Sequence, residues 1–226
     1  MKYLVFDFGG TLAEYKGLPP CWVDSYPDAF EHLGKLLECN FSEEQIKTAI
    51  EILQENNARI NPRTHEIPAE IIFEKVNQVL EINKPAAQTA GLFYSYFQKK
   101  LFVYEETKAV LNGFREKGIK IAVLSDLPTA MPHESFLEDL SKLEVQFDSV
   151  QSSQSVGFRK PEVKGLELIA RDFNCSLNEL WFIGDEKKDI ETIKKAGGKA
   201  VLINRTGETK TFGEDLQIKT LRELQE

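Results

Sequence analysis

The sequence predicts an α/β protein with a doubly wound parallel sheet that is interrupted by a helical insertion. Short apolar runs recur along the 226-residue chain, with helix-like segments between them. Runs that are apolar on both faces are typical of strands buried in a parallel sheet beneath helices. With 42% hydrophobic residues, the chain can bury the core of one large domain, or of a domain plus an insertion.

Five strands are expected. They are the runs KYLVFDF (2–8), KIAVLSD (120–126), FDSVQSS (147–153), LWFIGD (180–185) and KAVLIN (199–204). Two helices between them are also clear. Residues 105–118 begin with acids and end at Gly118, and residues 162–174 follow Pro161. Residues 1–13 and 105–226 are therefore expected to form the α/β core.

Residues 14–104 are expected to form an all-helical insertion, because no comparable β run occurs there and the apolar spacing becomes helical. The segments 42–57, 68–83 and 88–101 read as helices, the first with Ser42 as its N-cap. The expected core of the insertion contains Phe93, Tyr94, Tyr96 and Phe97.

Two parts of the insertion have competing interpretations. Arg59, Arg63 and His65 lie in a turn-rich connector and could contact an anionic substrate, but basic side chains in a polar loop are usually solvated. Cys21 and Trp22 could line a substrate pocket, although packing at a helix start is the commoner role. We expect the structural role in both cases.

Composition narrows the function classes. The 36 acidic and 28 basic residues give a formal net charge of −8, which disfavours binding to nucleic acid or to an anionic membrane. Three widely spaced cysteines support neither a disulfide framework nor a thiolate zinc site. No apolar run has the length of a signal peptide core or a membrane span. A cytoplasmic protein is expected, with no prediction of its oligomeric state.

Polar residues follow the predicted strands, at the edge of the sheet where ligands of open α/β sheets bind. They are Asp7, Gly9, Gly10, Thr11, Ser125, Asp126, Lys160, Asp185 and Asp189. A cluster of carboxylates needs a cation, and oxygen ligands shared with a phosphate suit Mg²⁺. Glycine N–H groups, a serine and a lysine can bind the phosphate, and an aspartate can attack it. These residues predict phosphoryl transfer.

The motifs DFGGTL, VLSD, VGFRKP and FIGDEKKD resemble those of the haloacid dehalogenase superfamily, in its phosphatase-type branch with a helical cap inserted after the first motif. The resemblance implies a Rossmann-like core and an active site that uses Mg²⁺. Asp7 would be the nucleophile and a metal ligand, together with the Gly9 carbonyl and Asp185. Asp189 would support the metal, a role compatible with capping the helix that follows.

The resemblance also implies which residues bind the substrate. Ser125 and Lys160 would bind the phosphoryl group, beside Gly10 and Thr11. Asp126 replaces a common asparagine, and its charge would either lie near the phosphate or point away from it. The cap would select the substrate, a small phosphorylated metabolite.

Gly9 departs from the family pattern. Phosphatases of the family usually have a second aspartate here, which protonates the leaving group and then activates water, a contribution of roughly 10²–10⁴-fold. Three explanations are open. Glu14 or a cap residue substitutes, the leaving group needs no proton, or catalysis is weak or lost and the protein binds a phosphorylated ligand or partner.

Two other reactions are minor alternatives. Haloacid dehalogenation needs a carboxylate nucleophile but no metal, so the retained GDEKKD run favours phosphoryl chemistry. Phosphonate hydrolysis needs a cap lysine that can form a Schiff base. Lys16, Lys35 and Lys47 are available, but the sequence marks none of them as buried.

Overall fold

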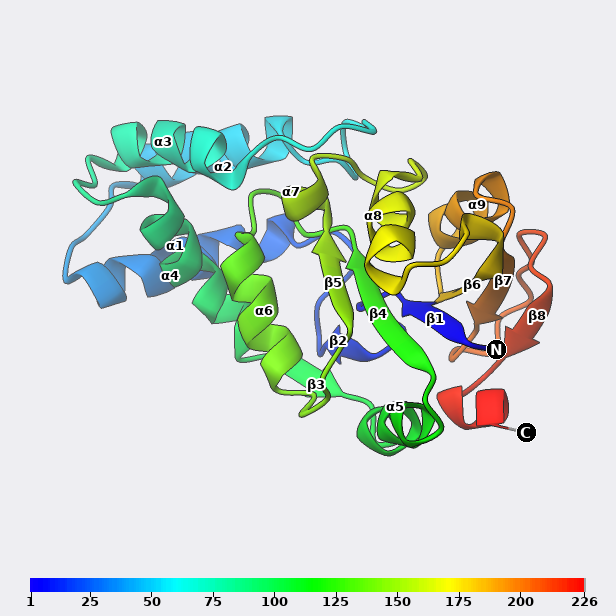
Figure 1. Ribbon diagram of the computed structural model, residues 1–226. Helices are drawn as coiled ribbons and strands as arrows, with labels where there is room; N and C mark the ends of the chain where they lie inside the picture. Colours follow the sequence, from blue (N-terminus) through cyan, green and yellow to red (C-terminus); the bar gives the residue numbers. More distant parts are fainter. Residues whose placement is uncertain (226) are drawn as a thin grey trace.

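The computed structural model describes residues 1–225 and contains a six-stranded parallel sheet (Figure 1). The strand order is β5-β4-β1-β6-β7-β8. The strands are β1 (Tyr3–Phe6), β4 (Lys120–Ser125), β5 (Ser149–Ser152), β6 (Leu180–Gly184), β7 (Lys199–Ile203) and β8 (Leu216–Ile218). The five predicted strands are confirmed. The edge strand β8 was not predicted, because two of its three residues are exposed and it has no apolar run.

Both faces of the sheet are covered, as expected for a doubly wound fold. Along β1 the side chains alternate between faces, so that Leu4 and Phe6 join one buried cluster and Val5 joins the other. Helices α8 (Lys164–Phe173) and α9 (Lys187–Lys195) pack on the Val5 face. Helix α5 (Thr107–Glu116) packs on the opposite face, where α6 (His133–Ser141) also contributes a buried phenylalanine.

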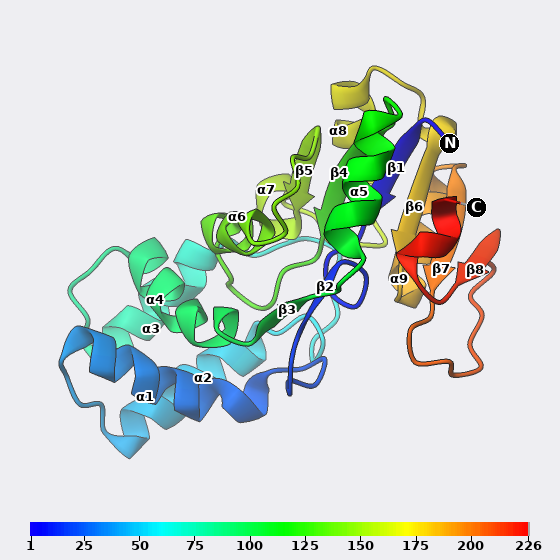
Figure 2. The ribbon, with the colours of Figure 1, turned by 90° about the horizontal axis from the view of Figure 1, so that it is seen from below.

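Four helices form a separate group beside the sheet (Figures 1 and 2). They are α1 (Tyr26–Leu37), α2 (Glu43–Glu55), α3 (Ala69–Leu80) and α4 (Ala86–Gln98). Helix α2 begins with the predicted Ser42 N-cap, which forms a reciprocal capping box with Gln45. Phe93, Tyr94 and Phe97 are buried among these helices, as predicted, whereas Tyr96 is only partly buried.

The segment from 14 to 104 is not entirely helical, which differs from the prediction. Strands β2 (Ala13–Tyr15) and β3 (Leu101–Val103) pair in antiparallel fashion where the chain leaves the core and returns to it. Each strand has only three residues, too few for a recognisable alternating pattern. The pairing depends on bringing two distant parts of the chain together.

The connector between α2 and α3 is attached to the core. Glu66 N–H donates to the Gly157 carbonyl and Arg159 N–H donates to the Thr64 carbonyl, each at a distance of 2.8 Å. The Glu66 carboxylate forms a buried ion pair with the Arg159 guanidinium and also accepts from Arg63 at 3.2 Å. The expectation that Arg63 is solvated is therefore wrong, because its side chain is only 10% exposed.

Within residues 1–225, no helix combines the length and apolar character needed to span a membrane.

Candidate active site

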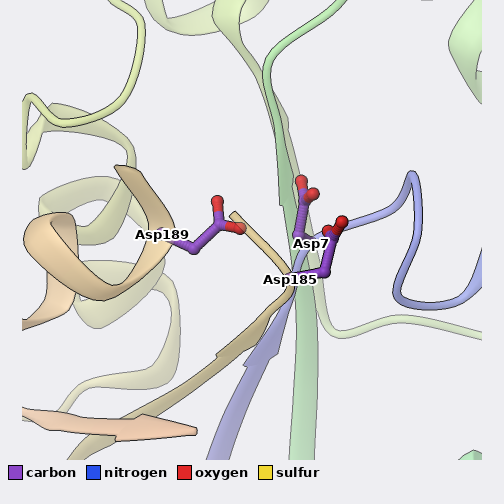
Figure 3. Close-up of side chains that lie close together, drawn as sticks. All are labelled: Asp7, Asp185 and Asp189. Carbon is purple, nitrogen blue, oxygen red and sulfur yellow. The ribbon is translucent and has the colours of Figure 1, made fainter. Parts of the chain in front are cut away.

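Three predicted acids converge at the carboxyl edge of the sheet (Figure 3). Asp7 follows β1, Asp185 follows β6, and Asp189 projects from the first turn of α9. One carboxylate oxygen from each residue lies within 4.8 Å of the other two. Hydrogen bonding of Asp7 N–H to the Ile183 carbonyl, at 2.8 Å, extends the pairing of β1 with β6 and places the first two carboxylates side by side.

Lys160 completes this cluster. Its Nζ lies 2.7 Å from Asp7 Oδ1 and 2.6 Å from Asp189 Oδ1, and its side chain is 1% exposed. Asp189 Oδ2 accepts from Glu186 N–H at 2.9 Å, so Asp189 also caps α9. The other oxygen, Asp189 Oδ1, receives no hydrogen bond of good geometry from residues 1–225, despite its proximity to Lys160.

The cluster is electrostatically unfavourable. Burial raises the pKa of Asp7 to about 7, with attraction from Lys160 opposing the shift and repulsion from Asp189 adding to it. Burial, followed by repulsion from Asp7 and Asp189, raises the pKa of Asp185 well above its usual range. Burial opposes the charge of Lys160, but attraction by Asp189 and Asp7 prevails and raises its pKa.

The donor set suits a divalent metal ion. Three ionised carboxylates and one ammonium group leave a formal charge of −2 in the cluster. The donors are oxygens, which Mg²⁺ prefers, and Asp189 Oδ1 is a buried oxygen that lies 2.6 Å from Lys160 Nζ but receives no hydrogen bond of good geometry within residues 1–225. These features fit the predicted metal site at Asp7 and Asp185, supported by Asp189.

The two glycines after β1 differ in what they require. Gly10 has a φ of +72°, and a Cβ at this position would lie 2.4 Å from Asp185 Oδ2, so only glycine fits. A Cβ at Gly9 would meet no atom within 4 Å, and its φ lies outside the left-handed region. A side chain therefore fits at residue 9, and the turn does not require the aspartate to be absent for steric reasons.

The remaining predicted residues surround this centre in different ways. Ser125, at the end of β4, lines the adjacent cavity. Thr11 is fully buried, and its hydroxyl donates to Asp185 Oδ1 at 3.4 Å, so it is positioned to orient that carboxylate. Asp126 accepts from Lys160 N–H at 3.0 Å, and its second oxygen lies 3.0 Å from Lys188 Nζ. The extra charge of Asp126 is thereby neutralised.

A cavity of about 640 Å³ opens from the acid cluster toward the helical insertion. Arg59 from the connector lines it and forms an ion pair with Glu186, with Nη2 to Oε1 at 2.7 Å. The Arg59 side chain is 45% exposed, which agrees with the expectation of a solvated residue. Its ion pair with Glu186, however, joins the insertion to the core, which that expectation did not include. Trp22 also lines the cavity while packing on Phe97, so both interpretations of that residue apply.

Sequence reasoning missed several residues of the site. Lys188 pairs with both Asp126 and Glu186, and it has no signal beyond its position in the GDEKKD run. Arg205 donates to the Thr11 carbonyl at 2.7 Å and thereby holds the loop after β1. Arg205 lies 194 residues from Thr11, and no local pattern could have found this contact.

Comparisons with known proteins find similar hydrolases. The chain is 29% identical to a phosphatase of Mycobacterium tuberculosis over 107 residues, which span 47% of this chain and 49% of that relative. It is 23% identical to haloacetate dehalogenase H-2 of Moraxella sp., over 92% of this chain and 87% of the relative. It is also 23% identical to the glyceraldehyde 3-phosphate phosphatase of Methanothermobacter thermautotrophicus, over 90% and 86% of the two chains.

The fold has a solved counterpart in a phosphatase from Thermococcus onnurineus, with a TM-score of 0.66 and 23% identity over 100% of this chain and 96% of that one. The family model described as haloacid dehalogenase-like hydrolase matches residues 1–197. This match covers the loop after β1, the insertion and all three acids of the cluster. The chain therefore belongs to the family of haloacid dehalogenase-like hydrolases.

Proposed function

We propose that this protein is a Mg²⁺-dependent phosphatase that hydrolyses a small phosphate monoester through an aspartyl-phosphate on Asp7. The observation that carries the proposal is the group of three carboxylates around Lys160, with a formal charge of −2, of which Asp7 and Asp185 line the cavity. Two curated relatives named as phosphatases support the same reaction class.

Each residue of the cluster has a role in this reaction. An Asp7 carboxylate oxygen attacks phosphorus, the P–O bond to the leaving group breaks, and water then cleaves the aspartyl-phosphate to release inorganic phosphate. Lys160 favours the ionised form of Asp7 and would neutralise charge on the phosphoryl oxygens. Ser125, which lines the cavity, would donate a hydrogen bond to the same group.

A bound Mg²⁺ would supply charge neutralisation at the phosphoryl oxygens. Asp7, Asp185 and the backbone carbonyl of Gly9 would hold it, with Asp189 supporting them. Thr11 would keep the Asp185 carboxylate in place through its hydroxyl group. Metal binding is thus expected to depend on residues that follow β1 and β6 and on a residue of α9.

The main alternative is a protein that binds a phosphorylated ligand or partner and turns it over negligibly, because Gly9 supplies no acid. Haloacid dehalogenation is disfavoured by the acid cluster, which that reaction does not need, although one relative carries that activity in its name. Phosphonate hydrolysis needs a buried lysine from the insertion. Lys16, Lys35 and Lys47 are all exposed, so none of them supports this reaction.

Phosphate release from a panel of phosphate monoesters, with and without Mg²⁺, tests the proposal. We expect turnover that requires Mg²⁺ and disappears in Asp7→Asn. Activity that persists in Asp7→Asn, or that is unaffected by a chelator, would contradict it. A silent wild type that becomes active as Gly9→Asp would favour the binding protein instead.

A cytoplasmic location and a small phosphorylated metabolite as the partner remain predictions. The first rests on the cysteine pattern, and Cys21, Cys39 and Cys175 are free thiols in the structure. The second rests on the size of the cavity and on the presence of Arg59, a cation, among the residues that line it.

A further inference from the structure

The cavity that contains Asp7 and Asp185 also has an aromatic wall. Its apolar lining comes from the start of the insertion, from the loop after β4 and from α6, and includes Tyr15, Trp22, Tyr26, Leu127, Met131 and Phe136. The Trp22 ring stacks on Phe97 with centroids 4.7 Å apart and meets Tyr15 edge-on at the same distance. Trp22 is 9% exposed and Tyr26 is 1% exposed, so neighbouring side chains hold both rings in place.

Each carboxylate outside the cluster that lines the cavity, among residues 1–225, has a hydrogen-bond or ion-pair partner. Besides Asp7 and Asp185, these lining carboxylates are Glu14, Asp126 and Glu186. Asp126 is paired with Lys188, and Glu186 is paired with both Arg59 and Lys188. Ion pairs of this kind favour the ionised form, which cannot donate a proton.

Glu14 is held differently. Its Oε2 accepts from the Tyr104 hydroxyl at 3.1 Å, on the face of β2 opposite to Tyr15. Tyr15 is the residue of this strand that packs against Trp22, whereas Glu14 lines the cavity from the other face of β2 with its carboxylate bound to the Tyr104 hydroxyl. Gly9, which has open space above its Cα, supplies no acid at all.

We propose that the substrate is an aryl phosphate, a phosphate monoester of a phenol-type hydroxyl whose ring lies against Trp22 and Tyr26. This inference rests on the proposed phosphatase function and names its substrate class. Two independent observations carry it: the aromatic wall of the cavity, and the fact that every carboxylate outside the cluster among the described residues that line the cavity already has a hydrogen-bond or ion-pair partner.

The chemistry follows from the acidity of the leaving group. A phenol has a pKa of about 10, whereas an aliphatic alcohol has a much higher pKa and is about as weakly acidic as water. When Asp7 attacks, the P–O(aryl) bond breaks and its electron pair leaves with the phenolate oxygen, which takes a proton from solvent. Water then adds to the aspartyl-phosphate, so that a phenol and inorganic phosphate are released. No general acid is needed in the first step.

The test compares phenyl phosphate with benzyl phosphate, which are close in size but differ in leaving-group acidity, and adds acetyl phosphate, a small substrate with a good leaving group. For the wild type with Mg²⁺ we expect kcat/KM to be at least about 100-fold higher for phenyl than for benzyl phosphate, the lower range of a general acid's contribution. In Gly9→Asp the ratio should fall below about tenfold, because benzyl phosphate gains the missing proton donor.

The wall is tested separately. Trp22→Ala should lower kcat/KM for phenyl phosphate at least tenfold more than for acetyl phosphate, and Trp22→Phe should restore most of the loss. Circular dichroism and thermal unfolding would verify that both variants fold.

The contrary outcomes are distinct. Equal rates for benzyl and phenyl phosphate in the wild type would overturn the inference, and loss of the benzyl activity in Glu14→Gln would identify Glu14 as the acid. Hydrolysis of acetyl phosphate alone, dependent on Mg²⁺ and Asp7, would leave the phosphatase intact and refute the aryl substrate. Silence toward all three substrates would refute the phosphatase and the inference together.

Discussion

The stability of Asp7→Asn relative to wild type, both without metal, should increase as the pH rises. Burial is the main reason that the pKa of Asp7 is raised from 3.8 to about 7 in the folded chain. A carboxyl group with a higher pKa in the folded state binds its proton more tightly there. Folding stability is therefore lost as the pH rises from the unfolded value through the folded one.

The magnitude follows from this shift. A difference of about 3 pKa units, at about 1.36 kcal/mol per unit, corresponds to about 4 kcal/mol of lost stability. Roughly 2 kcal/mol of this is already lost at pH 5, and the loss is nearly complete at pH 8. Asparagine carries no charge at either pH, so the variant escapes this part of the destabilisation.

Urea unfolding in the presence of a chelator, at pH 5, 6.5 and 8, measures the effect. The stability of Asp7→Asn relative to wild type should rise by about 2 kcal/mol between pH 5 and pH 8. Asp172→Asn is the matched control, because Asp172 is an exposed carboxylate on α8 that accepts from Ser149 Oγ at 2.7 Å, outside the site. It should show no such gain.

Mg²⁺ provides a second readout of the same charges. A ligand that binds only the folded state stabilises it, by about 2.7 kcal/mol at 100 times its Kd. Wild type and Asp172→Asn should therefore be stabilised by Mg²⁺ at pH 8, and Asp7→Asn much less. A difference between Asp7→Asn and wild type that stays flat from pH 5 to pH 8 would refute the electrostatic reasoning.

Three further predictions concern the loop after β1 and the contacts of the insertion. Gly10→Ala should lose roughly 1–3 kcal/mol of stability through its positive φ and its contact with a site carboxylate, whereas Gly9→Ala should change thermal stability little; equal losses would contradict this. Glu66→Gln should lose roughly 3–5 kcal/mol in urea unfolding, because it leaves the buried Arg159 guanidinium without its anion, and adding Arg159→Met should recover part of the loss. Arg59→Met should change stability by less than about 1 kcal/mol, because its ion pair is half-exposed, yet raise KM for substrates that fill the cavity; an unchanged KM would exclude Arg59 from binding.

Much of the fold and the acid cluster was predictable, because the relevant signals are local. Each buried strand is a short apolar run, and each site acid comes directly after such a run or one helical turn later. The rule that parallel strands present their carboxyl ends at one edge was then enough to group Asp7, Asp185 and Lys160. The small strands β2 and β3 escaped prediction because three residues carry no period.

The chemistry of Gly9 shows the limit of local information. The sequence shows that an acid is missing there, but leaves open whether Glu14 replaces it. The structure adds that the Glu14 carboxylate accepts a hydrogen bond from the Tyr104 hydroxyl. The other carboxylates that line the cavity outside the cluster, Asp126 and Glu186, form ion pairs with cationic side chains. Those pairings follow from the packing of separate elements, and no motif encodes them.

The alternation of apolar runs along the chain was sufficient for the α/β class, the strand ends and the acids of the site, since each depends on residues that are neighbours in sequence. Which charges neutralise one another was decided only by the tertiary structure. Arg59 meets Glu186 across 127 residues and Glu66 meets Arg159 across 93, and such contacts form only after the insertion has packed against the core. The aromatic wall has the same origin, because its rings come from two segments that no sequence spacing relates.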